Sequence, residues 1–179
     1  MTGIQSSIAD FNNYWREIPP IARVRRNHAL EHATINLLSQ QFPQTSIVGR
    51  SDTGGFYLIG GLPTEAVEEV AHQALDRLRA GEHHLAIHQN CGTNIVTSGL
   101  LAGLASFLAL AGSKSWRDRL DRLPLALTGS LLAILVSQPL GTKAQQHLTT
   151  DSNIGELEIV QIKRRQHGST VVHRVLTKS

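Results

Sequence analysis

The sequence predicts an α+β fold: a small antiparallel sheet with two helices, interrupted by a two-helix transmembrane hairpin. Segments of helical periodicity alternate with short runs of β-forming residues in the first half of the chain. Two segments without a charged residue, 94–112 and 123–142, follow in the middle. Two alternating runs near the C-terminus, 156–162 and 169–176, can add strands to the same sheet.

We expect four regions along the chain. Residues 1–22 form an N-terminal amphipathic segment, because apolar residues recur there at helical spacing between polar ones. Residues 23–93 form the first part of a metal-binding α+β domain, and residues 94–142 form the transmembrane helical hairpin. Residues 143–179 supply the C-terminal strands that complete the α+β domain.

The segment 23–41 contains neither glycine nor proline and carries enough apolar residues for a packed face, which predicts a helix. His28 and His32 are four residues apart, so both imidazoles lie on one helix face, about 5.4 Å apart along the axis. This spacing lets them reach one metal ion, and Glu31 can take a proton from a water molecule beside that ion. Because the chain has nine histidines, a chance pair on a polar helix surface is the alternative interpretation.

Two short β-forming runs, 47–48 and 56–59, predict a hairpin, because the residues between them favour turns. A second amphipathic helix is expected at 64–80, where it ends before Gly81. A short strand is expected at 85–87. The predicted order is therefore helix, strand, strand, helix, strand.

The two uncharged segments are each about long enough to cross a hydrocarbon core of about 30 Å. The residues between them, 113–122, include several charges and Trp116, which predicts a loop. Two buried helices in a soluble core are the alternative, but a small domain has little capacity to bury two wholly apolar helices. We therefore expect a multi-pass membrane protein with two spans and the lipid bilayer as a partner.

The side of the membrane is predicted from two opposing signals. The N-terminal part lacks the features of a signal peptide, which favours a cytoplasmic location for the globular part. Lysine and arginine in the 113–122 connection favour a cytoplasmic loop instead. We expect the globular part to be cytoplasmic.

Charge and cysteine content narrow the classes of partner. The formal net charge is +3 and no long basic run occurs, so no nucleic-acid partner is expected. Arg23, Arg25 and Arg26 gather at the start of the first helix, where they could serve a lipid headgroup or an anionic ligand. Cys91 is the only cysteine, which excludes an intramolecular disulfide and leaves a thiolate for chemistry or metal binding.

The order of three motifs resembles the bacterial S-ribosylhomocysteine lyases. The motifs are a His-Ala-Leu-Glu-His block at 28–32, Thr-Gly-Gly-Phe-Tyr at 53–57 and Cys-Gly-Thr at 91–93. The predicted order of elements is also similar to that of the pitrilysin-type inverzincin peptidases. The whole chain is similar to an uncharacterised, mainly cyanobacterial family of small membrane proteins with the same His-Ala-Leu-Glu-His and Cys-Gly-Thr-Asn blocks.

The lyase resemblance implies His28, His32 and Cys91 as metal ligands and Glu31 as the general acid/base. Three such ligands leave a fourth position open, as in catalytic rather than structural zinc sites. Zinc is the default metal, with iron and cobalt as alternatives. The reactive cysteine of the lyases has no counterpart here; Asp52 lies in the matching region and could act as a second acid/base. We therefore do not expect the lyase reaction.

Two functions follow from these observations. The first is a membrane-bound metal-dependent hydrolase that acts on a membrane-proximal substrate, because Thr93 adjoins the first uncharged segment. The second is a non-enzymatic, metal-stabilised membrane module that binds a protein partner. A homodimer is compatible with either function.

Overall fold

The computed structural model describes residues 17–179, apart from the side chain of His167. The N-terminal amphipathic segment expected at 1–22 falls largely outside these residues. The chain divides into two compact units. We call the unit that contains residues 17–88 and 148–179 the globular unit, and the unit formed by residues 89–147 the hairpin unit.

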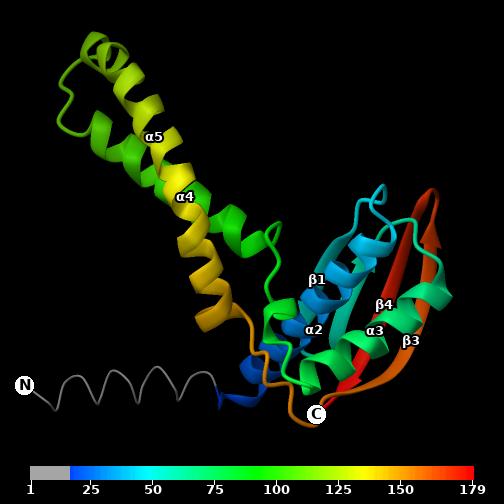
Figure 1. The fold of residues 1–179 in the computed structure, drawn as a ribbon. Coiled ribbons are helices and arrows are strands. Elements are labelled where there is room, and N and C mark those ends of the chain that lie inside the picture. Colours follow the sequence, from blue (N-terminus) through cyan, green and yellow to red (C-terminus); the bar gives the residue numbers. More distant parts are fainter. Residues whose placement is uncertain (1–16) are drawn as a thin grey trace, which may run out of the picture. The chain divides into compact units, whose positions relative to one another are not determined.

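The globular unit contains a four-stranded antiparallel sheet, which confirms the predicted α+β class. Its order is β1-β2-β4-β3, so the two C-terminal strands pair with the N-terminal hairpin, as Figure 1 shows. The strands are β1 (Val48–Asp52), β2 (Gly55–Ile59), β3 (Glu158–His167) and β4 (Thr170–Lys178).

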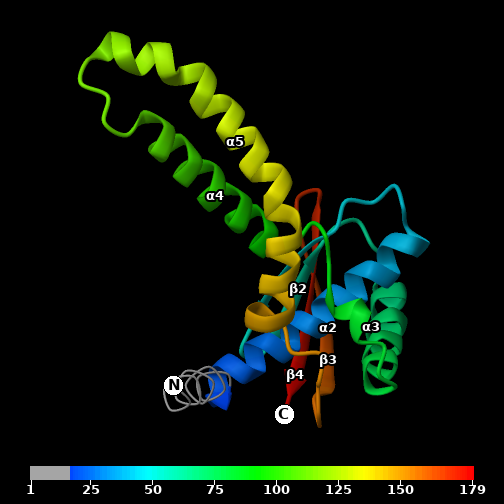
Figure 2. The ribbon, with the colours of Figure 1, turned by 60° about the vertical axis from the view of Figure 1, so that its left-hand side comes forward.

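Two helices, α2 (Pro19–Gln41) and α3 (Thr64–Arg79), pack on one face of this sheet (Figures 1 and 2). Because strand side chains alternate between faces, every second residue of β2 and β4 enters the core. Phe56, Leu58 and Val175 are fully buried there. The opposite face of the sheet keeps larger solvent exposure, for example at Ile59.

The hairpin between β1 and β2 is tighter than the sequence predicts. Residues 49–52, expected in a turn, belong to β1, because their backbone pairs with β2 in an unbroken register from Val48–Ile59 to Asp52–Gly55. Gly55 has a φ of 134°, and a Cβ there would collide with the carbonyl oxygen of Val175. This turn therefore needs a glycine.

The strand expected at 85–87 is not formed. Those residues belong instead mainly to a short 3-10 helix, His83–Ala86. The side chain of Asn36 on α2 donates hydrogen bonds to the carbonyl oxygens of Leu85 (2.9 Å) and Ile87 (2.9 Å). These contacts occupy the acceptors that a neighbouring strand would use, so the segment is held against the helix rather than the sheet.

The hairpin unit contains α4 (Gly92–Leu110) and α5 (Trp116–Ala144). A π-helical turn, Gln145–Thr149, follows α5 and continues into the first two residues of the segment 148–179. Both α4 and the stretch Trp116–Thr149 are long and apolar enough to span a membrane, and few of their residues are buried. Hydrogen bonds join the two helices within the unit, for example between the hydroxyls of Ser98 and Ser137.

The second helix of this unit begins earlier than expected. Residues 116–122, predicted as part of a loop, form the first turns of α5. The hydroxyl of Ser115 accepts a hydrogen bond from the backbone N–H of Asp118 (3.1 Å) and caps the helix. The connection between α4 and α5 is correspondingly short.

Candidate metal centre

His28 and His32 lie one turn apart on α2, and their ring centroids are separated by 4.2 Å. His28 is half-buried, whereas His32 is almost fully buried. The absence of glycine and proline from this stretch keeps the helix regular, so the four-residue spacing places both rings on one face. The pairing predicted from the sequence is therefore present.

Backbone carbonyls orient both imidazoles. Nδ1 of His28 lies 3.0 Å from the carbonyl oxygen of Thr149, and Nδ1 of His32 lies 2.7 Å from that of Ala86. A carbonyl oxygen can only accept a hydrogen bond, so Nδ1 carries the proton in both rings. In the neutral form of each ring, Nε2 is then the nitrogen without a proton. Metal-binding histidines in proteins are held in the same way.

Cys91 completes a group of three donors. One ligand atom each from His28, His32 and Cys91 lies within 4.8 Å of the others. Two imidazoles and a thiol suit zinc or iron better than calcium or magnesium, which prefer oxygen ligands.

Glu31 is buried against the first strand. Its side chain is 3% exposed, and the hydroxyl of Ser51 donates a hydrogen bond to its Oε2. A Cβ at Gly49 would collide with the Glu31 carboxylate, so the absence of a side chain at Gly49 makes room for it. Burial raises the pKa of the Glu31 carboxyl above its ordinary value, while the Ser51 hydrogen bond and the charge of His28 act in the opposite direction.

Asp52 faces away from Glu31, because it follows Ser51 on the same strand. Its Oδ1 accepts hydrogen bonds from the backbone N–H of Gly54 (2.8 Å) and from Arg174 (2.7 Å). Burial acts to raise the pKa of Asp52, but these two hydrogen bonds, together with the charges of Arg174 and Arg50, hold the pKa below its ordinary value. The structure does not group Asp52 with the histidines, and its role as a second acid/base stays a prediction.

The sequence did not indicate the role of Asn36. It lies one turn after His32, donates to the two carbonyls that hold residues 85–87, and contacts Nδ1 of His88 through its Oδ1 (2.7 Å). Burial, followed by the charge of His32, lowers the pKa of His88. Asn36 thus holds residues 85–88 against α2. Cys91 follows His88 by three residues along the chain. A polar residue four positions after a histidine was the only signal for this role.

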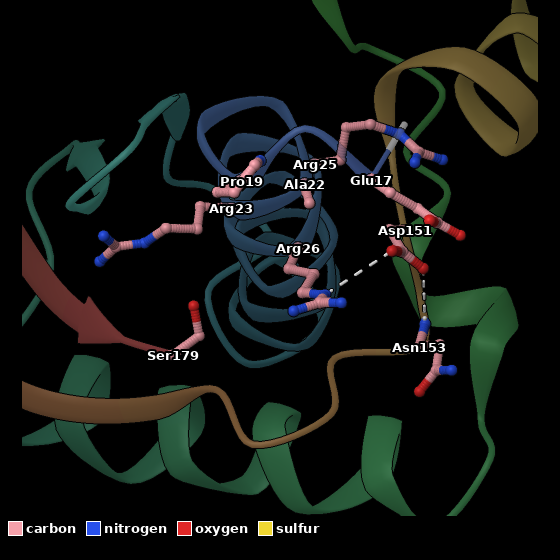
Figure 3. A pocket seen from close by; sticks show the side chains of 9 residues that line it. All are labelled: Glu17, Pro19, Ala22, Arg23, Arg25, Arg26, Asp151, Asn153 and Ser179. Carbon is pink, nitrogen blue, oxygen red and sulfur yellow. Dashed lines mark hydrogen bonds and ion pairs between the residues drawn. The ribbon is translucent and has the colours of Figure 1, made fainter. Parts of the chain in front are cut away.

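The arginines at the start of α2 anchor a neighbouring segment. Arg25 donates a hydrogen bond to the carbonyl oxygen of Thr150 (2.8 Å), and the backbone N–H of Asp151 donates to the carbonyl oxygen of Arg25 (3.1 Å). Arg26 forms an ion pair with Asp151 (3.7 Å), in the cavity of about 630 Å³ shown in Figure 3. These contacts hold the segment whose Thr149 carbonyl orients His28.

Comparisons with known proteins identify a family. Residues 23–162 match the model of a domain of unknown function, DUF6391. An uncharacterised protein of the cyanobacterium Picosynechococcus sp. (strain PCC 7002) is 39% identical over 140 residues, which is 71% of this chain and 65% of that protein. No solved structure gives a significant match. The match to the family model covers well over half of the chain, and this chain belongs to the DUF6391 family.

Proposed function

We propose that this protein is a membrane-anchored, metal-dependent hydrolase with His28, His32 and Cys91 as metal ligands and Glu31 as general acid/base. The observation that carries the proposal is the backbone carbonyl that each of the two imidazoles contacts through Nδ1. A backbone carbonyl holds each ring at Nδ1, so the neutral form of each ring would offer Nε2 to a metal, in a group with the Cys91 thiol. A helix with a chance pair of surface histidines would not require two such acceptors.

The proposed chemistry divides between metal and protein. The metal, with zinc as the default and iron or cobalt as alternatives, would polarise the substrate and lower the pKa of water. The Glu31 carboxylate would accept a proton from the attacking water and pass it to the leaving group. Ser51 would hold that carboxylate in position through the hydrogen bond to Oε2.

The lyase resemblance supports the same ligand set. In those enzymes the histidines of the matching helix and the cysteine of the Cys-Gly-Thr segment hold the metal. The donor group of His28, His32 and Cys91 is consistent with that assignment. The cytoplasmic location of the globular part remains a prediction.

The experiment that tests this function combines metal content with turnover. Full-length protein purified in detergent under reducing conditions is expected to hold about one metal ion per chain, and His32→Ala is expected to lose it. His72→Ala is the matched control, because His72 is an exposed histidine on α3. Glu31→Gln should keep the metal but abolish hydrolysis of ester and peptide substrates. Metal-free wild-type protein after reconstitution would refute the proposal.

One observation favours the alternative, a partner-binding module. The face of the sheet opposite α2 and α3 carries a row of directly paired residues, Arg50, Tyr57, Arg174 and Lys163, with the Arg174 guanidinium 4.2 Å above the Tyr57 ring. Such a basic row with an aromatic residue suits an acidic protein surface. If Glu31→Gln leaves cellular function intact while Lys163→Glu abolishes it, this alternative replaces the hydrolase. Whether the partner is a second copy of this chain is tested by measuring the mass of the protein in detergent solution.

A further inference from the structure

A cavity of about 550 Å³ lies beside His28 within the globular unit. Its volume is in the range in which proteins bind small molecules. Ile21 and Val24 form part of its wall, on the same face of α2 as His28 because they precede it by seven and four residues. Pro20 and Leu148 add further aliphatic surface. One region of the cavity is therefore apolar.

The cavity also contains polar groups of the proposed active site. His28 and Ser51 both line it, and the Ser51 hydroxyl is bonded to the Glu31 carboxylate. A polar ligand would leave the aliphatic wall in contact with water. An apolar chain would cover that wall, and each CH₂ group it buries is expected to raise affinity about fourfold.

Two residues that line this cavity belong to the end of a candidate spanning helix. Leu148 and Thr149, which line the cavity, are the last residues of the candidate spanning helix Trp116–Thr149, whose uncharged part, 123–142, ends six residues before Leu148. The end of a membrane-spanning helix lies at the bilayer surface. Amphiphiles with an acyl chain are concentrated at that surface, so the position of these two residues in the chain favours a lipid-like ligand over a water-soluble one.

We propose that the cavity holds the acyl chain of an amphiphilic ester whose carbonyl carbon lies at His28. This inference rests on the hydrolase function proposed above. In the reaction, the oxygen of water bonds to the carbonyl carbon, and the bond from that carbon to the alcohol oxygen breaks. Glu31 transfers one proton from the water to the leaving alcohol. The products are a carboxylic acid and an alcohol, and no oxidant or reductant is needed.

The test uses full-length, metal-loaded protein in lipid nanodiscs and a dodecanoic acid analogue with a diazirine at its methyl end. After illumination, peptide mapping is expected to find the label on residues 20–24 and on Leu148, with loss of labelling when unmodified dodecanoate competes. Val24→Trp fills the cavity and should reduce labelling by more than tenfold, as expected when two or more CH₂ contacts are lost. If the Val24→Trp variant fails to bind the metal, the Ile21→Trp variant is used for the same test.

Val160→Trp is the matched control, because Val160 is 60% exposed on β3 and does not line the cavity. It should label as the wild type does. Labelling confined to other segments, with metal retained, would overturn the cavity assignment. Competition by an apolar peptide amide but not by dodecanoate would overturn the acyl class. Labelling of the cavity in a chain that binds no metal would support the acyl site and refute the hydrolase.

Discussion

Adding one methyl group at Gly49 should displace the carboxylate of Glu31. A Cβ built at Gly49 falls within 3.0 Å of the carboxylate and of Cδ1 of Ile35. The backbone at Gly49 does not have a positive φ, so alanine is strained there only by these side chains. Both neighbours are buried, and neither can retreat into solvent. Gly49→Ala therefore tests directly whether Glu31 lies against β1.

The cost has two parts. Overpacking of a filled core costs about 1–3 kcal/mol. Loss of the hydrogen bond from Ser51 to a buried carboxylate adds about 1.5–3 kcal/mol if the carboxylate is pushed away. Partial relaxation makes a sum of about 3 kcal/mol reasonable, which corresponds to a fall in Tm of about 10 °C for a domain of this size. The assay is thermal unfolding of the detergent-solubilised chain, followed by turnover.

Gly61→Ala is the matched control. A Cβ at Gly61 meets nothing within 4 Å, so its Tm should stay within about 2 °C of the wild type. Gly49→Ala should also lose hydrolysis while it keeps the metal, because the imidazoles have their own carbonyl partners. If both variants match the wild type in Tm and turnover, the packing of Glu31 against β1 is wrong.

Three further outcomes are expected. Asn36→Leu releases the 85–87 segment and should weaken metal affinity about tenfold, measured by competition with a chelator; unchanged affinity would contradict the positioning role. Removal of the metal should lower the Tm of the wild type but not that of His32→Ala, since only a protein that binds the ion is stabilised by it. The Asp52–Arg174 pair depresses the folded pKa of Asp52, so its stabilisation is present above the ordinary aspartate pKa and is lost as the pH falls through the folded pKa. Because the Asp52 side chain is 41% exposed, solvent screening limits the stabilisation by this pair to about 0.5 kcal/mol. Asp52→Asn should therefore reduce the loss of unfolding free energy at acidic pH by that amount. A loss as large as that of the wild type would refute the pairing.

The histidine pair could be predicted because it depends only on local helix geometry. A stretch without glycine or proline fixes the spacing of His28 and His32, whatever surrounds it. Cys91 could not be assigned from local spacing. The order of the three motifs along the chain indicated it. The sequence therefore indicated the three residues that form the group, but not the carbonyls that orient the imidazoles.

The partners of these donors could not be read from local composition. Gly49 and Ser51 have the composition of a turn, and only pairing with β2 makes them part of a strand that faces Glu31. The carbonyls of Ala86 and Thr149 carry no side-chain signal at all. These positions are determined by contacts between residues far apart in the sequence, and the residue types alone do not predict such contacts.

The start of α5, in contrast, was visible in the sequence. Ser115 and Asp118 form the spacing of an N-terminal cap, a serine followed three residues later by an acid. The charges of 113–122 favoured a loop in the prediction, and the capping pattern was the better signal. Charge alone does not exclude a helix whose side chains are exposed.

The most direct test of the account is the X-ray absorption spectrum of the metal in the purified full-length chain. If His28, His32 and Cys91 hold a zinc ion, the spectrum should show one sulfur ligand at about 2.3 Å and two nitrogen ligands at about 2.0–2.1 Å. The sulfur shell should disappear in Cys91→Ser. A wild-type spectrum with only oxygen and nitrogen ligands, or the same spectrum in Cys91→Ser, would contradict the ligand set of His28, His32 and Cys91.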